Sequence, residues 1–178
     1  VVDLVEEGID AAVRIAHLPE SSVVAVRVGE TQRVVCAAPA YLKKSGRPRQ
    51  PADLREHRCI VFTGLSPDNE WLFGATRAGR VSIRPVLRTN QFDVAIDACL
   101  HGLGCGQFLC YQVEAAVKAG RLRRLLDEFA TPPVPIQIVY PHARLLSPNV
   151  RASVDLAAAR LRPQPAGAGR DFARPAAS

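Results

Sequence analysis

Two carboxylates and an imidazole recur every fourth residue in the middle of the chain, at Asp93, Asp97 and His101. On a helix this spacing places the three side chains on one face, where they can bind a metal ion or exchange protons. Nothing else in the chain completes such a site at a suitable spacing, and a solvated helix face is therefore the favoured interpretation. We predict no catalytic residue and no metal site here.

Two further patterns with chemical potential also favour structural interpretations. His17 and Ser21 combine a base with a nucleophile, but the sequence has no nucleophile elbow and no third group to orient the base. The glycines of Gly102-x-Gly104-x-Gly106 end a helix instead of opening one. They therefore predict a tight turn with close backbone packing and no dinucleotide cofactor.

The cysteines form an odd set of five in apolar sequence contexts, without Cys-x-x-Cys spacing. This usage is typical of buried, reduced thiols in a cytosolic protein. Cys105 and Cys110 have four residues between them, but a zinc site needs further ligands, which we do not find.

The stretch from Asn90 to Gly106 must position the acidic and imidazole side chains, and its pattern predicts a helix. Asn90 is a good N-cap, because its side-chain oxygen can accept an unpaired amide proton of the first turn. Apolar residues follow at helical spacing, and Gly102 supplies the left-handed residue that ends the helix. With the apolar pair Val86-Leu87 before it, the stretch predicts one strand-helix-strand crossover of an α/β sheet.

Composition and length favour an ordinary globular domain or two small lobes. The chain has 178 residues, 48% of them hydrophobic, and a formal net charge of +6. No apolar run approaches the roughly 20 residues that cross a bilayer, and no signal peptide is visible. The chain contains no methionine, so we interpret it as a fragment of a longer protein. The positive charge permits an acidic partner without demonstrating one.

Other segments have patterns of strands and helices. Ile9 to Ile15 is an apolar run that predicts a strand covered on both faces. Glu70 to Phe73 and Arg80 to Val86 predict a hairpin, anchored by Trp71. Tyr111 to Ala119 predicts a helix that ends before a glycine.

Several ordered segments together resemble the effector-binding domain of LysR-type transcriptional regulators, over roughly residues 1–162. The set in its order is far more specific than any one of its motifs. The matching segments are Val2 to Ile15, Leu18 to Ser22, Cys36 to Leu42, Pro51 to Leu54, His57 to Ile60, Gly102 to Gly104, Leu122, Pro132-Pro133 and Val139 to Pro141.

The resemblance implies an α/β fold of two lobes, similar to the periplasmic binding proteins. It implies mostly parallel central sheets with helices on both faces, and two crossing strands as the hinge. We expect residues 1–30 and 136–162 to form the first lobe, truncated at its N-terminus, and residues 31–135 the second. Residues 163–178, rich in Pro, Gly and Ala, are predicted to be a disordered tail.

The resemblance also implies a small effector held between the lobes, at loops that follow strand carboxyl ends. We expect Thr89, Asn90 and Gln91 to face a carboxylate-bearing or polar effector, because a helix N-terminus favours negative charge. Asn90 can equally be a cap that touches only its own helix, and Arg14 can pair with a nearby acid. The predicted ligand-binding residues are Arg14, His17, Ser21, Ser22, Thr63, Thr89, Asn90, Gln91, Phe108 and Tyr111, with the last two forming an apolar wall.

The predicted function is that of a cytoplasmic, effector-sensing regulatory domain without a cofactor. The resemblance implies that a small organic acid or polar metabolite is the effector, and that DNA is bound by an N-terminal helix-turn-helix domain absent from this sequence. It also implies a homodimer or homotetramer for the intact protein, with no membrane partner. A solute-binding protein of a transporter, or an enzyme on the same two-lobed fold, are the alternatives.

Overall fold

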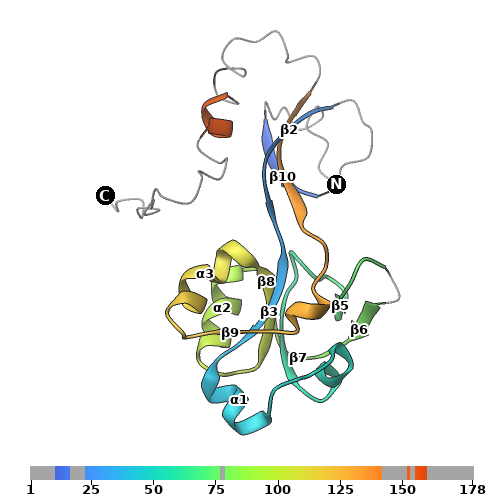
Figure 1. Ribbon diagram of the computed structural model, residues 1–178, viewed down its shortest axis with the longest axis vertical. Coiled ribbons are helices and arrows are strands. Elements are labelled where there is room, and N and C mark those ends of the chain that lie inside the picture. Colours follow the sequence, from blue (N-terminus) through green and yellow to red (C-terminus); the bar gives the residue numbers. More distant parts are fainter. Residues whose placement is uncertain (1–10, 17–22, 77–78, 142–151, 153–154, 160–178) are drawn as a thin grey trace. The chain divides into compact units, whose positions relative to one another are not determined.

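The computed structural model describes residues 11–16, 23–76, 79–141, 152 and 155–159 (Figure 1). The chain divides into two compact units. The first unit comprises Val1–Glu30 with Pro135–Ser178, and the second comprises Thr31–Val134. The predicted tail at 163–178 lies outside the described residues, and so do the loop residues 17–22.

The first unit contains a sheet of three strands in the order β1-β10-β2. These strands are β1 (Ala12–Ile15), β2 (Val23–Thr31) and β10 (Val134–Pro141). Val28, Ile138 and Ala158 form a small core beside them. β1 is an edge strand that pairs only with β10 among the described strands, and Val13 is 57% exposed. The prediction of a strand covered on both faces is therefore wrong for the described part of that segment.

The second unit is built on a five-stranded sheet in the order β7-β4-β8-β3-β9. Its strands are β3 (Arg33–Ala37), β4 (Arg58–Phe62), β7 (Arg84–Thr89), β8 (Cys105–Leu109) and β9 (Arg123–Leu125). β4 runs parallel to β7 and β8, whereas β3 runs antiparallel to β8 and β9. The sheet is thus mixed and not mostly parallel as predicted, because β3, which continues the chain from β2, runs against its neighbours.

The predicted crossover is confirmed as β7, α2 (Phe92–Leu100) and β8, with β4 lying between the two strands. Gly102 ends the helix with a left-handed φ of 76°. A Cβ on Gly104 would lie 2.3 Å from the carbonyl oxygen of Arg58. The glycine-rich segment is therefore a tight turn with close backbone packing, as predicted.

Two apolar clusters cover the two faces of this sheet. On the helix face, α2 and α3 (Cys110–Lys118) pack over Val34, Cys36, Ile60 and Phe108. The hairpin face is covered by short elements, which pack over Val35, Ala37, Cys59 and Val61. These elements are α1 (Pro39–Ser45), the 3-10 helices η1 (Pro51–Arg55) and η3 (Asp127–Phe129), and the hairpin of β5 (Glu70–Leu72) and β6 (Arg80–Ser82). Figure 1 shows α2 and α3 on one side of the sheet and the strands β5 and β6 on the other.

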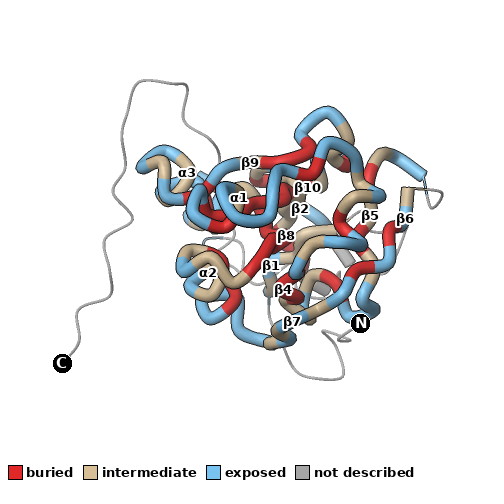
Figure 2. The backbone as a smooth tube through the Cα atoms, turned by 90° about the horizontal axis from the view of Figure 1, so that it is seen from below, coloured by how far each residue is buried: buried red, intermediate tan, exposed pale blue. Residues whose placement is uncertain are grey.

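The hairpin has the predicted anchor but a shorter second strand. Trp71 is 1% exposed and lies opposite Val81. The predicted strand from Arg80 to Val86 is divided at Ile83, whose amide donates to the carbonyl of Asn69. The chain changes sheets there, because β6 pairs with β5 whereas β7 pairs with β4. Figure 2 shows the resulting interior, in which β8 is buried along its length.

Candidate functional site

The carboxyl ends of the parallel strands β4, β7 and β8 meet at one edge of the second unit's sheet. Thr63 follows β4 and Thr89 ends β7. The Thr63 amide donates to the Thr89 carbonyl oxygen at 2.9 Å, and the Thr63 hydroxyl donates to the same oxygen at 3.3 Å. Both threonines are partly buried. Two of the residues predicted to bind a ligand are thus held in direct contact.

The N-terminus of α2 lies at the same edge. Gln91 is its N-cap residue, and the Gln91 amide donates to the Thr89 hydroxyl at 3.1 Å. The first helical bond runs from the Ala95 amide to the Gln91 carbonyl, so the amides of residues 92–94 precede the intrahelical ladder. The prediction that Asn90 caps this helix is wrong by one residue, because the first intrahelical bond is accepted by the Gln91 carbonyl, and the Gln91 side chain makes no capping bond. Asn90 itself is exposed.

An aromatic pair, which the sequence did not indicate, joins the two elements at this edge. The rings of Phe62 and Phe92 meet edge to face, with centroids 6.4 Å apart. Phe62 ends β4 and Phe92 begins α2, and Phe92 remains 41% exposed. The pair therefore places an apolar surface next to the polar groups of Thr63 and Thr89. Its only sequence signal is that each phenylalanine adjoins a predicted site residue.

The starts of β3 and α3 are tied together at the end of β8. The Cys110 amide donates to the Gln32 carbonyl at 2.9 Å, and the Cys110 sulfur lies 3.3 Å from the buried Thr31 hydroxyl. The Gln32 side-chain amide donates to the Thr131 carbonyl at 2.9 Å. These bonds fix the backbone where the chain enters the second unit.

The predicted apolar wall of Phe108 and Tyr111 does not form. Phe108 is fully buried in the cluster on the helix face, so its ring has no surface for a ligand. Side chains of β8 alternate between the two faces of the sheet, and Phe108 falls on the face that α2 and α3 cover. Tyr111 is 54% exposed and lines a hollow of about 410 Å³ beside α3, whose lining does not include Thr63 or Thr89. Partial burial raises the pKa of the Tyr111 phenol.

The remaining predicted ligand contacts belong to the first unit. Arg14 is partly buried on β1, opposite Gln137 of β10. His17, Ser21 and Ser22 lie outside the described residues. The ligand contacts expected of these four residues stay a prediction.

The polar face of α2 is exposed at Asp93, Asp97 and His101. An imidazole nitrogen of His101 lies 2.7 Å from the Asp97 carbonyl oxygen, a contact within one helix. Among the described residues, no group of three or more His, Cys, Asp or Glu side chains is placed to hold a metal ion. In the same part of the chain, no helix is long and apolar enough to cross a membrane.

Comparison with known proteins shows which family this domain belongs to. The family model of the LysR substrate binding domain matches residues 1–162. The chain belongs to this family, and the predicted resemblance is confirmed.

The similar proteins have names consistent with that family. The chain is 31% identical over 156 residues to the uncharacterized HTH-type transcriptional regulator YcaN of Escherichia coli K12, covering 86% of this chain and 51% of YcaN. It is 32% identical over 152 residues to YhjC of the same organism, covering 84% and 51%. The regulatory domain of CrgA, a LysR-type transcriptional regulator from Neisseria meningitidis, superposes with a TM-score of 0.74 at 26% identity, covering 88% of this chain and 78% of that domain. The chain spans about half the length of the curated relatives it matches.

Proposed function

We propose that the chain is the effector-sensing domain of a cytoplasmic LysR-type transcriptional regulator and performs no catalysis. The observation that carries the proposal is the family match over residues 1–162, together with relatives named as HTH-type transcriptional regulators. DNA would be bound by a helix-turn-helix domain in another part of the regulator, which acts as a homodimer or homotetramer. Effector binding would shift the population between conformations of the regulator through its different affinity for them.

The sheet edge at Thr63, Thr89 and the N-terminus of α2 suits a small organic acid or polar metabolite best as the effector. The amides of residues 92–94 point out of the N-terminus of α2, where the helix dipole favours negative charge. The Thr89 hydroxyl accepts a bond from Gln91 and can still donate one to a ligand. The exposed ring of Phe92 adds an apolar contact for the remainder of the molecule.

Asp93 makes this site testable by charge. Its carboxylate lies in the first turn of α2, where it would repel a carboxylate on the ligand. For an anionic effector we expect the substitution Asp93→Asn to tighten binding, by about twofold to fivefold at low salt. Weaker binding after this substitution would mean that the effector presents a positive group or a donor to this edge.

Calorimetry and thermal shift with a panel of aliphatic and aromatic acids and neutral metabolites test the proposal directly. Thr89→Val removes the hydroxyl that faces the edge, and we expect it to weaken effector binding by roughly fivefold to tenfold. Thr76→Val is the matched control, because Thr76 is exposed in the loop of the hairpin. A panel without any hit, or equal losses in both variants, would contradict an effector site at this edge.

The role of the DNA-binding part is tested separately. We expect residues 1–178 alone to show no operator-specific retention in a gel-shift experiment, despite the net charge of +6. The intact regulator should retain its operator, and its mobility or affinity should change when the effector is added. Operator-specific binding by the isolated chain would contradict the proposal that DNA is bound by another part of the regulator. Turnover of a panel compound would contradict the proposal that the chain performs no catalysis.

A further inference from the structure

A second polar site lies on the hairpin face of the sheet, at the end of β8, where Arg33 pairs with Leu109. It is centred on Arg33, the first residue of β3, whose side chain shares the hairpin face with Val35 because side chains alternate along a strand. Arg33 is partly buried, and burial lowers the pKa of its guanidinium. Within the described residues its guanidinium makes no hydrogen bond and no ion pair. A partly buried cation without a counter-charge is costly unless an anion joins it.

Arg33 borders a cavity of about 220 Å³ that contains both signs of charge. Arg80 and Glu70 form an ion pair across its hairpin wall, at 3.1 Å. Asp68 also lines the cavity, is exposed, and has no ion pair or hydrogen bond in the described part of the chain. The full lining is Arg33, Leu65, Ser66, Pro67, Asp68, Glu70, Leu72 and Arg80. Arg33 and Asp68 are thus the two charges of the cavity that remain available to a ligand.

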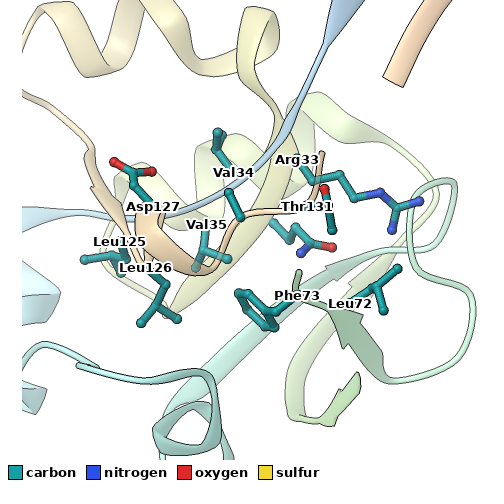
Figure 3. Close-up of a pocket in the computed structure, with 11 residues that line it drawn as sticks. Arg33, Val34, Val35, Leu72, Phe73, Leu125, Leu126, Asp127 and Thr131 are labelled. Atoms are coloured by element: carbon teal, nitrogen blue, oxygen red, sulfur yellow. The ribbon is translucent and has the colours of Figure 1, made fainter. Parts of the chain in front are cut away.

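Buried polar side chains line the same cavities as Arg33. Ser66 and Gln107 are 4% and 3% exposed, and the Ser66 hydroxyl donates to the Gln107 side-chain oxygen at 3.3 Å. Thr131 is 7% exposed, and its hydroxyl has no hydrogen-bond partner among the residues that the structure describes. Arg33, Gln107 and Thr131 line one small pocket of about 10 Å³, shown in Figure 3, which shares Arg33 and Leu72 with the larger cavity. The Thr131 hydroxyl lines only this small pocket, whose volume suits a single water molecule, so the ligand site proper is the larger cavity at Arg33.

We propose that this cavity binds a small monocarboxylate that also has a hydrogen-bond donor, such as a short hydroxy acid or amino acid. The guanidinium of Arg33 offers a planar pair of donors to the carboxylate. Asp68 accepts a bond from the hydroxyl or ammonium group of the same molecule. The volume lies below the roughly 300–1,000 Å³ of typical ligand pockets, so the ligand is small.

The charges of the cavity argue against other anions. Asp68 and Glu70 would repel a phosphate or a dicarboxylate, whose second charge would have no counter-ion after Arg80 has paired with Glu70. The apolar side chains of Leu65 and Leu72 instead suit the short carbon chain of a monocarboxylic acid. The lining of this cavity contains neither Thr63, Thr89 nor a residue of α2, although Leu65 and Ser66 closely follow Thr63 in the chain.

Two-dimensional NMR of the labelled chain, titrated with acetate, lactate, alanine and phosphate, tests the proposal. Lactate or alanine should shift the signals of Ser66 and of the Gln107 side-chain amide, acetate should do so more weakly, and phosphate should not. Asp68→Asn distinguishes the two ligand types, because it should weaken alanine binding strongly and lactate binding only slightly. Acetate binding should be unchanged or tighter in that variant.

Substitutions at Arg33 give the decisive comparison. Arg33→Gln should weaken binding of the best ligand roughly 10- to 100-fold, and Arg33→Lys, which keeps the charge without the planar geometry, by less. Arg84→Gln is the matched control on an exposed strand residue and should leave this binding unchanged. The proposal is overturned if no monocarboxylate shifts Ser66 or Gln107, if phosphate binds best, or if both lysine and glutamine at position 33 leave binding intact.

Discussion

The two faces of the second unit's sheet have equally buried cores but different covers. On the helix face, two helices of nine residues each lie over the sheet, and Phe108 is fully buried there. On the hairpin face the cover consists of strands of three residues and short helices, with Trp71 as the largest buried side chain. Long helices cover an apolar surface continuously, whereas short elements leave gaps between them, and the cavity at Arg33 is one such gap.

The polar groups near the two faces differ in the same way. Beside α2, Thr63 and Thr89 satisfy one another and the start of the helix. Beside the hairpin, the Thr131 hydroxyl and the Arg33 guanidinium have no polar partner in the described ranges of the chain. Buried polar groups are normally paired, so the unpaired groups on the hairpin face lower the free energy of unfolding. A ligand that binds there would raise it again.

The largest expected effect is the loss of either core anchor. Phe108→Ala and Trp71→Ala should each lower the free energy of unfolding by about 3–5 kcal/mol, because each removes a fully buried aromatic side chain. Urea unfolding followed by far-UV circular dichroism measures both. A loss below about 1 kcal/mol for Trp71→Ala would show that the hairpin is dispensable and that the two faces are not equal in packing.

Alkaline pH should reveal the buried thiols, which are divided between the faces. Burial raises the pKa of Cys99 on the helix face and of Cys59 on the hairpin face to about 12. The unfolded thiols ionise near about pH 8.5, so this contribution to stability is complete below that pH and is lost as the pH rises toward about 12. The expected slope is about 1.4 kcal/mol per pH unit for each thiol.

Urea unfolding between pH 8 and pH 10 measures this slope, and variants divide it between the faces. Cys99→Ala and Cys59→Ala should each remove the share of one thiol from the wild-type slope. A variant with the slope unchanged would mean that its thiol is already ionised or accessible to solvent in the folded state.

The same substitution should have opposite signs at two threonines. Thr131→Val replaces an unsatisfied buried hydroxyl by a methyl group and should stabilise the chain by about 1 kcal/mol. Thr63→Val removes the hydroxyl that donates to the Thr89 carbonyl and should destabilise by about 1 kcal/mol. Thermal unfolding of the two variants in parallel measures the sign of each stability change. Destabilisation by Thr131→Val would show that its hydroxyl is bonded, through a water for example.

Local patterns predicted the helix face well, because its information is contiguous in the chain. The spacing of apolar residues in α2, the stop at Gly102 and the following buried strand all lie within residues 90–109. The cap was misplaced because the position of Thr89 depends on its pairing with Thr63, which lies 26 residues away. The burial of Phe108 was missed for a different reason. A strand pattern shows that alternate side chains share a face, but it does not show which face of the sheet each set occupies.

The Arg33 site could not be predicted from such patterns. Its members are distant in the sequence, from Arg33 through Ser66 and Gln107 to Thr131, and each is an ordinary polar residue in its local context. They meet only because β3 lies beside β8 and because the hairpin is placed over one face. A strand pattern can show which residues share a face, but the gaps left by short covering elements depend on tertiary packing.

The smallest expected effects come from the surface ion pairs, one on each side of the sheet. Lys118 and Glu114 are 2.5 Å apart within α3, and Arg80 and Glu70 are 3.1 Å apart across the hairpin. Both pairs are exposed, so Glu114→Gln and Glu70→Gln should each cost no more than about 0.5 kcal/mol, and less in high salt. Glu70→Gln also frees Arg80 beside the cavity, so it should tighten carboxylate binding there whereas Glu114→Gln should not. Chemical denaturation with and without added lactate measures both effects, and equal behaviour of the two variants would remove the electrostatic distinction between the faces.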